Sequence, residues 1–180
     1  KENEFKDLYE EIEGHHEKVF VKETQIDADF ELLFPDDYIN NITERLNLYT
    51  ELNQVKDEEA LKKFETELVD RFGELPVEAE DLLNSVRIKW IANAMGLEKI
   101  VMKQGKMIGY FISDQQSGFY QSPQFNKVLQ FVQVFQTICK IKEKQTRNGL
   151  RLLLVFDNIK SIDKAYLALQ PFEEKKKTVV

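Results

Sequence analysis

The sequence predicts an α+β domain in which a mixed or antiparallel sheet packs against a group of helices. Three observations support this fold class. Residues 19–34 alternate between apolar and polar side chains, as a half-buried strand does. Residues 39–95 contain three stretches with apolar side chains at helical spacing. The second half of the chain contains two hairpin signals, one around Gln104–Gly105 and one around Asn148–Gly149.

The chain is expected to divide into an arm, a main domain and a tail. Residues 1–18 would form the arm, residues 19–172 the domain, and residues 173–180 a tail that we expect to be disordered. Within the arm, residues 3–13 have helical spacing, and Gly14 suits the end of this helix. Because the first residue is Lys1 and not Met, we expect a piece of a longer protein. The apolar stripe of the arm consists of Phe5, Leu8, Tyr9 and Ile12.

Residues 19–34 are predicted to form one long strand with a buried face and an acidic face. Successive side chains of a strand point to opposite sides, so alternate residues share a face. Acidic side chains on the second face would also protect a sheet edge from unwanted pairing. The apolar face contains Phe20, Ile26, Ala28, Phe30, Leu32 and Phe34, and the other contains Glu23, Gln25, Asp27, Asp29 and Glu31.

Three helices are predicted next, at residues 39–55, 58–72 and 76–95. Gly73 would stop the second helix, and Pro76 would open the third at its first turn. Each helix has an apolar stripe that we expect to face a common core. The stripes are Ile42, Leu46, Tyr49 and Leu52; Leu61, Phe64, Leu68 and Phe72; and Leu82, Leu83, Val86, Trp90 and Ala94.

The second half of the chain is predicted to combine hairpins and helices. Residues 100–112 read as a hairpin, and Ser122–Pro123 is a typical helix start. Residues 138–145 and 150–156 would form a second hairpin, whose second strand is apolar enough to be central in the sheet. Ser161 is expected to cap a final helix that runs through Leu169.

Charge is distributed unevenly along the chain, whose net charge is −7. Residues 1–37 carry thirteen acidic and four basic side chains, and the remaining residues carry nineteen and twenty-one. An acidic field repels phosphate and favours basic protein surfaces, so a protein partner is expected before a nucleic acid.

We expect the isolated domain to be monomeric. We also expect it not to be membrane-bound, because no apolar run approaches the roughly 20 residues of a membrane span. A single cysteine, Cys139, excludes an internal disulfide and fits a cytoplasmic location.

The motifs of an enzyme are missing from the sequence. Gly105–Lys106 is the nearest approach to a phosphate-binding loop, but Met107 stands where that loop needs Ser or Thr. His15–His16 are the only histidines and lack the spacing of a metal-ligand pair on a helix. Cys139 has no histidine near it in sequence to serve as a base, so it is interpreted as a buried structural residue. We therefore expect no catalytic activity, no cofactor and no metal.

Three polar groups have two readings each. Asp36–Asp37 follow Pro35 and would cap the next helix, although paired carboxylates could also act in catalysis. The segment from Lys140 to Arg147 alternates basic and other residues, which fits an exposed hairpin face or a weak nucleic-acid contact. A polar cluster near the end of the helix at 58–72 consists of Glu67, Asp70 and Arg71. It is either a solvated helix surface, with Lys63 paired to Glu67, or a site that binds a partner protein.

Three sequence blocks follow one another between residues 30 and 76: FELLFPDDYI at 30–39, RLNLYTEL at 45–52 and ELVDRFGELP at 67–76. Together they resemble the C-terminal domain of the bacterial transcription-repair coupling factor. This factor is a large DNA translocase that removes stalled RNA polymerase and recruits excision repair. The resemblance covers about residues 20–172, with residues 113–127 and the arm unmatched. A fourth, looser block contains Leu83, Arg87, Ala92, Ala94, Gly96, Leu97, Lys99 and Ile100.

The resemblance implies a regulatory domain with no reaction of its own. In the family, this domain folds back on an N-terminal module that is similar to UvrB, hides the UvrA-binding surface and restrains translocation. Full-length partners would be UvrA, RNA polymerase and duplex DNA, and residues 1–18 would lead in from the translocase module. The alternative is a nucleic-acid-binding accessory module of a DNA translocase. The implied interface is Glu67, Asp70 and Arg71, with Asp27, Asp29 and Glu31 as a second candidate.

Overall fold

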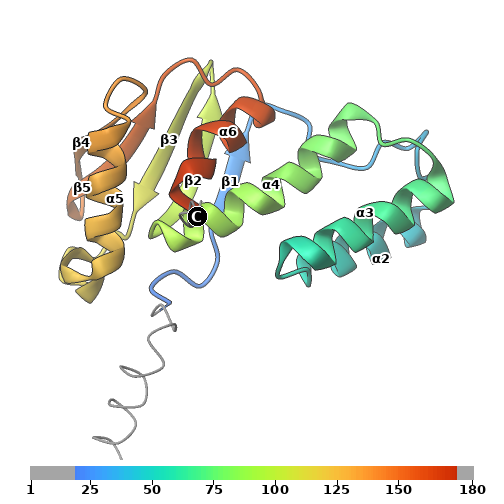
Figure 1. The fold of residues 1–180 in the computed structure, drawn as a ribbon, viewed down its shortest axis with the longest axis horizontal. Helices are drawn as coiled ribbons and strands as arrows, with labels where there is room; N and C mark the ends of the chain where they lie inside the picture. The colour runs from blue at the N-terminus through green and yellow to red at the C-terminus, as the bar shows by residue number, and fades with distance from the viewer. Residues whose placement is uncertain (1–18, 174–180) are drawn as a thin grey trace, which may run out of the picture.

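The computed structural model describes residues 19–173, which form a five-stranded mixed sheet and two groups of helices (Figure 1). The strand order is β1-β2-β3-β5-β4. β1 pairs with β2 in parallel, and the other neighbours are antiparallel. This arrangement confirms the predicted α+β class. The strands are β1 (Gln25–Ala28), β2 (Leu97–Lys103), β3 (Lys106–Phe111), β4 (Cys139–Thr146) and β5 (Gly149–Phe156).

The described helices divide between one face of the sheet and a separate helical half (Figure 1). The C-terminal part of α4, together with α5 and α6, covers the sheet. α2 and α3 pack against the N-terminal part of α4, away from the sheet. We call α2, α3 and that part of α4 the helical half. The helices are α2 (Ile42–Asn53), α3 (Glu58–Phe72), α4 (Val77–Ala94), α5 (Pro123–Val134) and α6 (Ile162–Glu173), with a 3₁₀ turn η1 (Gly118–Gln121).

Each half has its own apolar core, and α4 belongs to both. Leu83 of α4 is buried with Phe64 and Leu68 of α3 in the core of the helical half. Further along α4, Ile91 is buried with sheet residues such as Leu154. The two cores contact different sides of α4, which explains why its apolar side chains do not form a single narrow stripe.

Several predicted helix ends are confirmed by their capping contacts. α3 ends at Gly73, whose φ of +89° lies in the left-handed region that favours glycine. The Ser122 hydroxyl accepts a hydrogen bond from the Phe125 N–H at the start of α5, and the Ser161 hydroxyl does the same for the Lys164 N–H at the start of α6.

The predicted cap at Asp36–Asp37 is wrong. α2 begins at Ile42, and its N-cap is Asn41, whose side chain accepts a hydrogen bond from the Glu44 N–H. Asp36 and Asp37 lie instead in an exposed turn, where the Asp36 carboxylate pairs with Arg45. The turn forms because the Pro35 carbonyl accepts hydrogen bonds from the N–H groups of residues 38 and 39.

The long strand predicted at residues 19–34 is also wrong, since only Gln25–Ala28 pair with the sheet. Beyond Ala28 the chain crosses from the sheet to the helical half. Phe30 packs against the first core and Phe34 is buried in the second, so the apolar alternation continues without a partner strand. Residues 29–31 therefore do not extend an acidic strand face.

The predicted stripe of α2 is only partly correct. Leu52 is buried and Tyr49 packs against the core, but Ile42 is 65% and Leu46 60% exposed. Leu48, which was not predicted, is buried in their place. The buried arc of α2 is narrower than its apolar content suggests, which leaves an exposed apolar pair on this helix.

Both predicted hairpins form, the second with its turn shifted by one residue. Gln104 and Gly105 both have positive φ, as expected for a two-residue hairpin turn. In the second hairpin Thr146 pairs with Gly149, so the loop contains residues 147 and 148. β5 lies between β3 and β4, which confirms its predicted central position. The predicted arm, with its stripe and His15–His16, and the tail from residue 174 lie outside the described residues.

Candidate protein-interaction site

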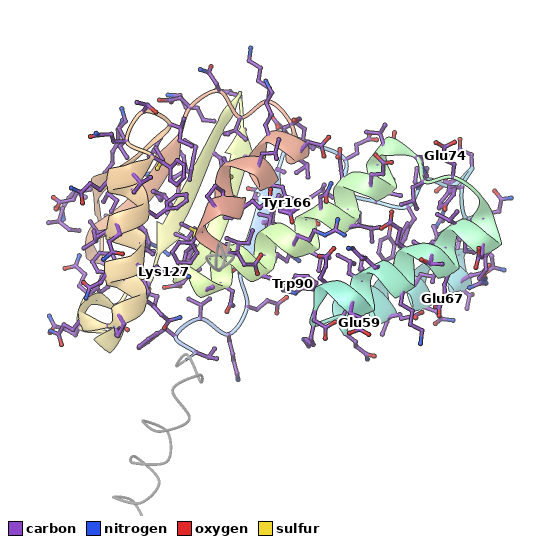
Figure 2. All side chains as sticks on the ribbon, in the orientation of Figure 1. Glu59, Glu67, Glu74, Trp90, Lys127 and Tyr166 are labelled. Carbon is purple, nitrogen blue, oxygen red and sulfur yellow. The ribbon has the colours of Figure 1, made fainter. Side chains whose placement is uncertain are left out.

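α3 presents two unlike sides because its apolar residues recur at helical spacing. Leu61, Phe64 and Leu68 are buried against the rest of the helical half. Glu67 and Asp70 are exposed on another side of the same helix. Figure 2 shows Glu67 along the outer edge of the helical half. Within residues 19–173 neither carboxylate takes part in an ion pair, so both charges are available to a partner.

A narrow groove between α2 and α3 brings a further carboxylate to this surface. Glu51 of α2 and Glu67 of α3 both line the groove, which has a volume of about 260 Å³. Lys63 is the one cation among its lining residues. The ion pair expected between Lys63 and Glu67 is not among those formed in the described part of the chain. Glu51, Glu67 and Asp70 are named the docking face below.

Arg71, unlike its two acidic neighbours, already has a charged partner inside the domain, and its predicted place at the interface stays a prediction. Its guanidinium pairs with the carboxylate of Glu44 and so joins α3 to α2. The same guanidinium lies 4.8 Å from the centre of the Phe72 ring. Half of the Arg71 side chain is exposed, so one side of it still faces solvent. Arg71 is therefore a residue that positions the end of α3.

Tyr38 fixes the turn after α3. Its hydroxyl donates a hydrogen bond of 2.8 Å to the Gly73 carbonyl, and its ring lies 5.7 Å from that of Phe72. Partial burial raises the pKa of the Tyr38 phenol, so the donor stays protonated near neutral pH. The end of α3, which carries Asp70, is thus held by contacts from a segment distant in sequence.

An ion pair joins α3 to α4 at the opposite end of α3. The Arg87 Nε lies 2.9 Å from Glu58 Oε2, and its Nη2 lies 2.7 Å from Glu58 Oε1. This two-point contact is the geometry that makes guanidinium–carboxylate pairs strong. The hydrogen bond with Glu58 is the main cause that raises the pKa of Arg87. α3 is therefore fixed at both ends, and its acidic side has a defined orientation.

The second predicted set of acidic residues serves largely to support the sheet. Asp27 pairs with Lys103 at 3.0 Å, and Asp29 Oδ2 accepts a hydrogen bond of 3.1 Å from the Gln104 N–H. These contacts tie β1 and the following bend to the β2–β3 hairpin. Glu31 is exposed and has no ion pair among the described residues. The three residues thus do not form one continuous acidic surface.

The other residues considered from the sequence have structural surroundings. Cys139 is buried in β4, and burial raises its pKa to about 11. Trp90 packs against the core of the helical half and lines a cleft of about 600 Å³ between the two halves (Figure 2). Within residues 19–173 no group of His, Cys, Asp or Glu is arranged to hold a metal ion. No helix in the same range is long and apolar enough to cross a membrane.

The sequence did not point to Glu51, which lines the same groove as Glu67. Glu51 lies on a different helix from Glu67, so only the packing of α2 on α3 places the two carboxylates in one groove. The exposed pair Ile42 and Leu46 was also missed, because apolar spacing predicted burial. Neither feature has a local signal that distinguishes it from an ordinary helix surface.

The fold and the site define an α+β domain with a separate helical half that bears an acidic, unpaired face. Residues 28–122 match the TRCF domain family. Since this match covers more than half of the chain, the chain belongs to that family, as the sequence blocks predicted.

Relatives of known name agree with this assignment. The chain is 31% identical to the transcription-repair-coupling factor of Rickettsia bellii over 65% of its length, and 33% identical to that of Escherichia coli K12 over 47%. It is 34% identical to the factor of Staphylococcus haemolyticus over 59%. These alignments span only 10%, 7% and 10% of the respective relatives.

A solved structure supports the fold. The crystal structure of the C-terminal domain of a transcription-repair coupling factor superimposes with a TM-score of 0.64. The superposition covers 84% of this chain and 92% of the other. At 18% identity this likeness concerns the fold alone.

Proposed function

We propose that this chain is the regulatory C-terminal domain of a transcription-repair coupling factor and that it has no reaction of its own. Its docking face would bind the UvrB-like N-terminal module of the same protein. In that docked state it would hide the surface that UvrA recognises and restrain translocation on duplex DNA. The observation that carries the proposal is the set of exposed carboxylates, Glu51, Glu67 and Asp70, without ion pairs in the described chain.

The size and charge of the groove favour a basic side chain as its occupant. A volume of about 260 Å³ lies below the roughly 300–1,000 Å³ of small-molecule sites. Glu51 and Glu67 would both accept hydrogen bonds from an inserted guanidinium, and Asp70 would receive a second cation from the partner. Hydrogen bonds to charged groups contribute about 1.5–3 kcal/mol each, so two or three contacts would give a specific but reversible interaction.

Covalent linkage makes such modest contacts sufficient. A domain on a flexible linker competes for its site at millimolar effective concentration. Engagement of RNA polymerase or DNA elsewhere in the protein would then need a coupling free energy of only about 1–3 kcal/mol to release the domain. A strong permanent interface would prevent this release.

The direct test is binding in trans between this chain and the separate N-terminal module, measured by calorimetry. The variant Glu67→Lys/Asp70→Lys should abolish measurable binding, because it places cations opposite the basic partner surface. The matched control is Glu59→Lys/Glu74→Lys, which makes the same charge change at two other exposed positions in the helical half (Figure 2). The control should bind within about threefold of the wild type, since rim charges far from a contact contribute little. Equal loss in both variants, or none in either, would contradict the proposed face.

A further inference from the structure

The face of the sheet opposite the helices is the most distinctive surface that the proposed docking leaves unused. The strand register shows which side chains share it. Val101, Ile108, Val155 and Lys140 form one row across β2, β3, β5 and β4. In the next row, Lys99, Tyr110, Leu153 and Lys142 lie side by side. Neighbours on this face are Lys144 and Arg151. None of the described helices packs here, because α4, α5 and α6 lie on the other face (Figure 1).

The apolar centre of this face is already largely covered. Leu153 and Val155 are only 7% and 6% exposed, although neither belongs to the two apolar cores. Their direct neighbours in register on β4 are Lys142 and Lys140, whose aliphatic stems are placed to cover them. The surface that remains consists mainly of ammonium groups above an apolar floor. A partner helix would therefore gain little further apolar burial there.

Five lysines of this face have no ion pair among residues 19–173, whereas Lys103 on the same face pairs with Asp27; the five are Lys99, Lys106, Lys140, Lys142 and Lys144. We call them the lysine face. Lys144 stands directly opposite Arg151, whose guanidinium pairs with the Glu98 carboxylate at 3.8 Å, so Lys144 is the cation of this pair that lacks an ion pair among residues 19–173. Lysines on an edge strand also prevent edge-to-edge pairing, which would account for those on β4. That explanation does not cover Lys99, which lies on β2 between two other strands.

We propose that the lysine face binds the phosphodiester backbone of nucleic acid. Residues 19–31 and 96–173, which contain all five strands, carry twelve basic and ten acidic side chains, whereas residues 39–95 carry seven basic and twelve acidic, so the helical half is acidic and the sheet half is slightly basic. Tyr110 is the one aromatic residue in the rows above, and the Arg151 guanidinium lies 5.3 Å from its ring centre. The face thus lacks an open platform for stacked bases. Binding is then to backbone charge, without sequence preference, and depends strongly on salt.

The test is fluorescence anisotropy with a labelled duplex of about 20 base pairs in roughly 50 mM salt, using the whole chain. The wild type should bind with a dissociation constant of about 10–100 µM, in the range of non-specific complexes. Lys140→Glu/Lys142→Glu should weaken binding at least about tenfold and reduce the slope of log affinity against log salt by about 2. The control Lys56→Glu/Lys62→Glu makes the same charge change at exposed positions just before and within α3 and should weaken binding less than about threefold.

Three results would overturn the proposal. The first is no binding by the wild type at the low salt concentration. The second is an equal effect of the two variants, which would show a response to net charge alone. The third is that the same lysines bind an acidic peptide, such as a synthetic copy of residues 1–18, more tightly than they bind the duplex. This result would assign the lysine face to a protein segment. Comparison of the duplex with its single strand identifies the preferred form, since a backbone site without stacking should not favour the single strand.

Discussion

Glu51 of α2 and Glu67 of α3 line the same groove, although they belong to different helices. Two carboxylates beside one lysine leave an excess of negative charge at this point of the surface. The contacts that hold α3 at both ends, Arg71 with Glu44 and Arg87 with Glu58, fix the orientation of the groove. An acidic groove of this size fits the recognition of a basic side chain.

Gly96→Ala is expected to destabilise the domain more than Gly105→Ala. Both glycines have φ in the left-handed region, where a side chain costs about 1–2 kcal/mol. A Cβ on Gly96 would also overlap the buried Phe119 ring, whereas one on Gly105 would meet only the Lys160 side chain at 3.9 Å. Overpacking adds about 1–3 kcal/mol for Gly96. Urea unfolding of the two variants measures the difference, and equal midpoints would show that Phe119 moves aside freely.

Arg87→Lys should cost about 1–2 kcal/mol of unfolding free energy. Lysine keeps the charge but cannot make the two-point contact with Glu58, or the additional 2.7 Å hydrogen bond from Arg87 to Asn84. Arg87 is only 15% exposed, so solvent does not replace these contacts fully. Thermal unfolding checks this, with Lys89→Arg on the same helix as the control. A melting temperature unchanged from wild type would mean that the pair has no net stabilising effect.

Phe72→Ala should destabilise the domain by about 1–3 kcal/mol, less than the roughly 3–5 kcal/mol of a fully buried aromatic residue. The sequence predicted a core position, but Phe72 is half-buried, between Tyr38 and the Arg71 guanidinium. Phe64→Ala, at a residue that is 3% exposed, should show the full core effect. Denaturant midpoints rank the two variants. A larger loss at Phe72 than at Phe64 would contradict the partial burial of Phe72.

The Cys139 thiol should be unreactive in the folded chain. Burial raises its pKa from 9.0 to about 11, so the thiolate fraction at pH 8 falls about a hundredfold. Because the thiol pKa is higher in the folded chain than in the unfolded chain, the neutral Cys139 thiol contributes fully to folding stability below pH 9. This contribution is lost as pH rises through 11. A disulfide reagent at pH 8 should label the urea-unfolded chain at least about a hundred times faster than the native chain. Comparable rates would place the thiol in solvent.

Local patterns predicted α3 correctly because its two signals, apolar spacing and a glycine stop, agree. They failed at residues 29–34, where alternation comes from a segment that crosses between two cores and not from a strand. They also failed at Ile42 and Leu46, because the width of the buried arc depends on what packs against the helix. These errors share one cause. Periodicity shows which side of a segment could be buried, but tertiary packing decides which residues on that side are buried.

Candidate surfaces were predictable only where their residues lie on one element. Glu67 and Asp70 share a helix, so spacing and the resemblance pointed to them, and their place at an interface stays a prediction. Glu51 joins them through packing, and Lys99 joins the lysines of β4 through the register of four strands. Arg71 was expected at the interface, but its ion pair with Glu44 could not be read from local sequence. Which residues share a surface is thus decided by contacts between elements that are distant in sequence.

The docking face is proposed to hide the UvrA-binding surface of the full-length factor. The direct measurement is the affinity of the full-length factor for UvrA, with basal DNA translocation as a second readout. Glu67→Lys/Asp70→Lys should bind UvrA more tightly and translocate faster without polymerase, because loss of a desolvated charge contact costs about 2–5 kcal/mol. Glu59→Lys/Glu74→Lys should leave both values unchanged. If the first variant is folded and yet keeps wild-type UvrA affinity and translocation, the docking face does not mask UvrA.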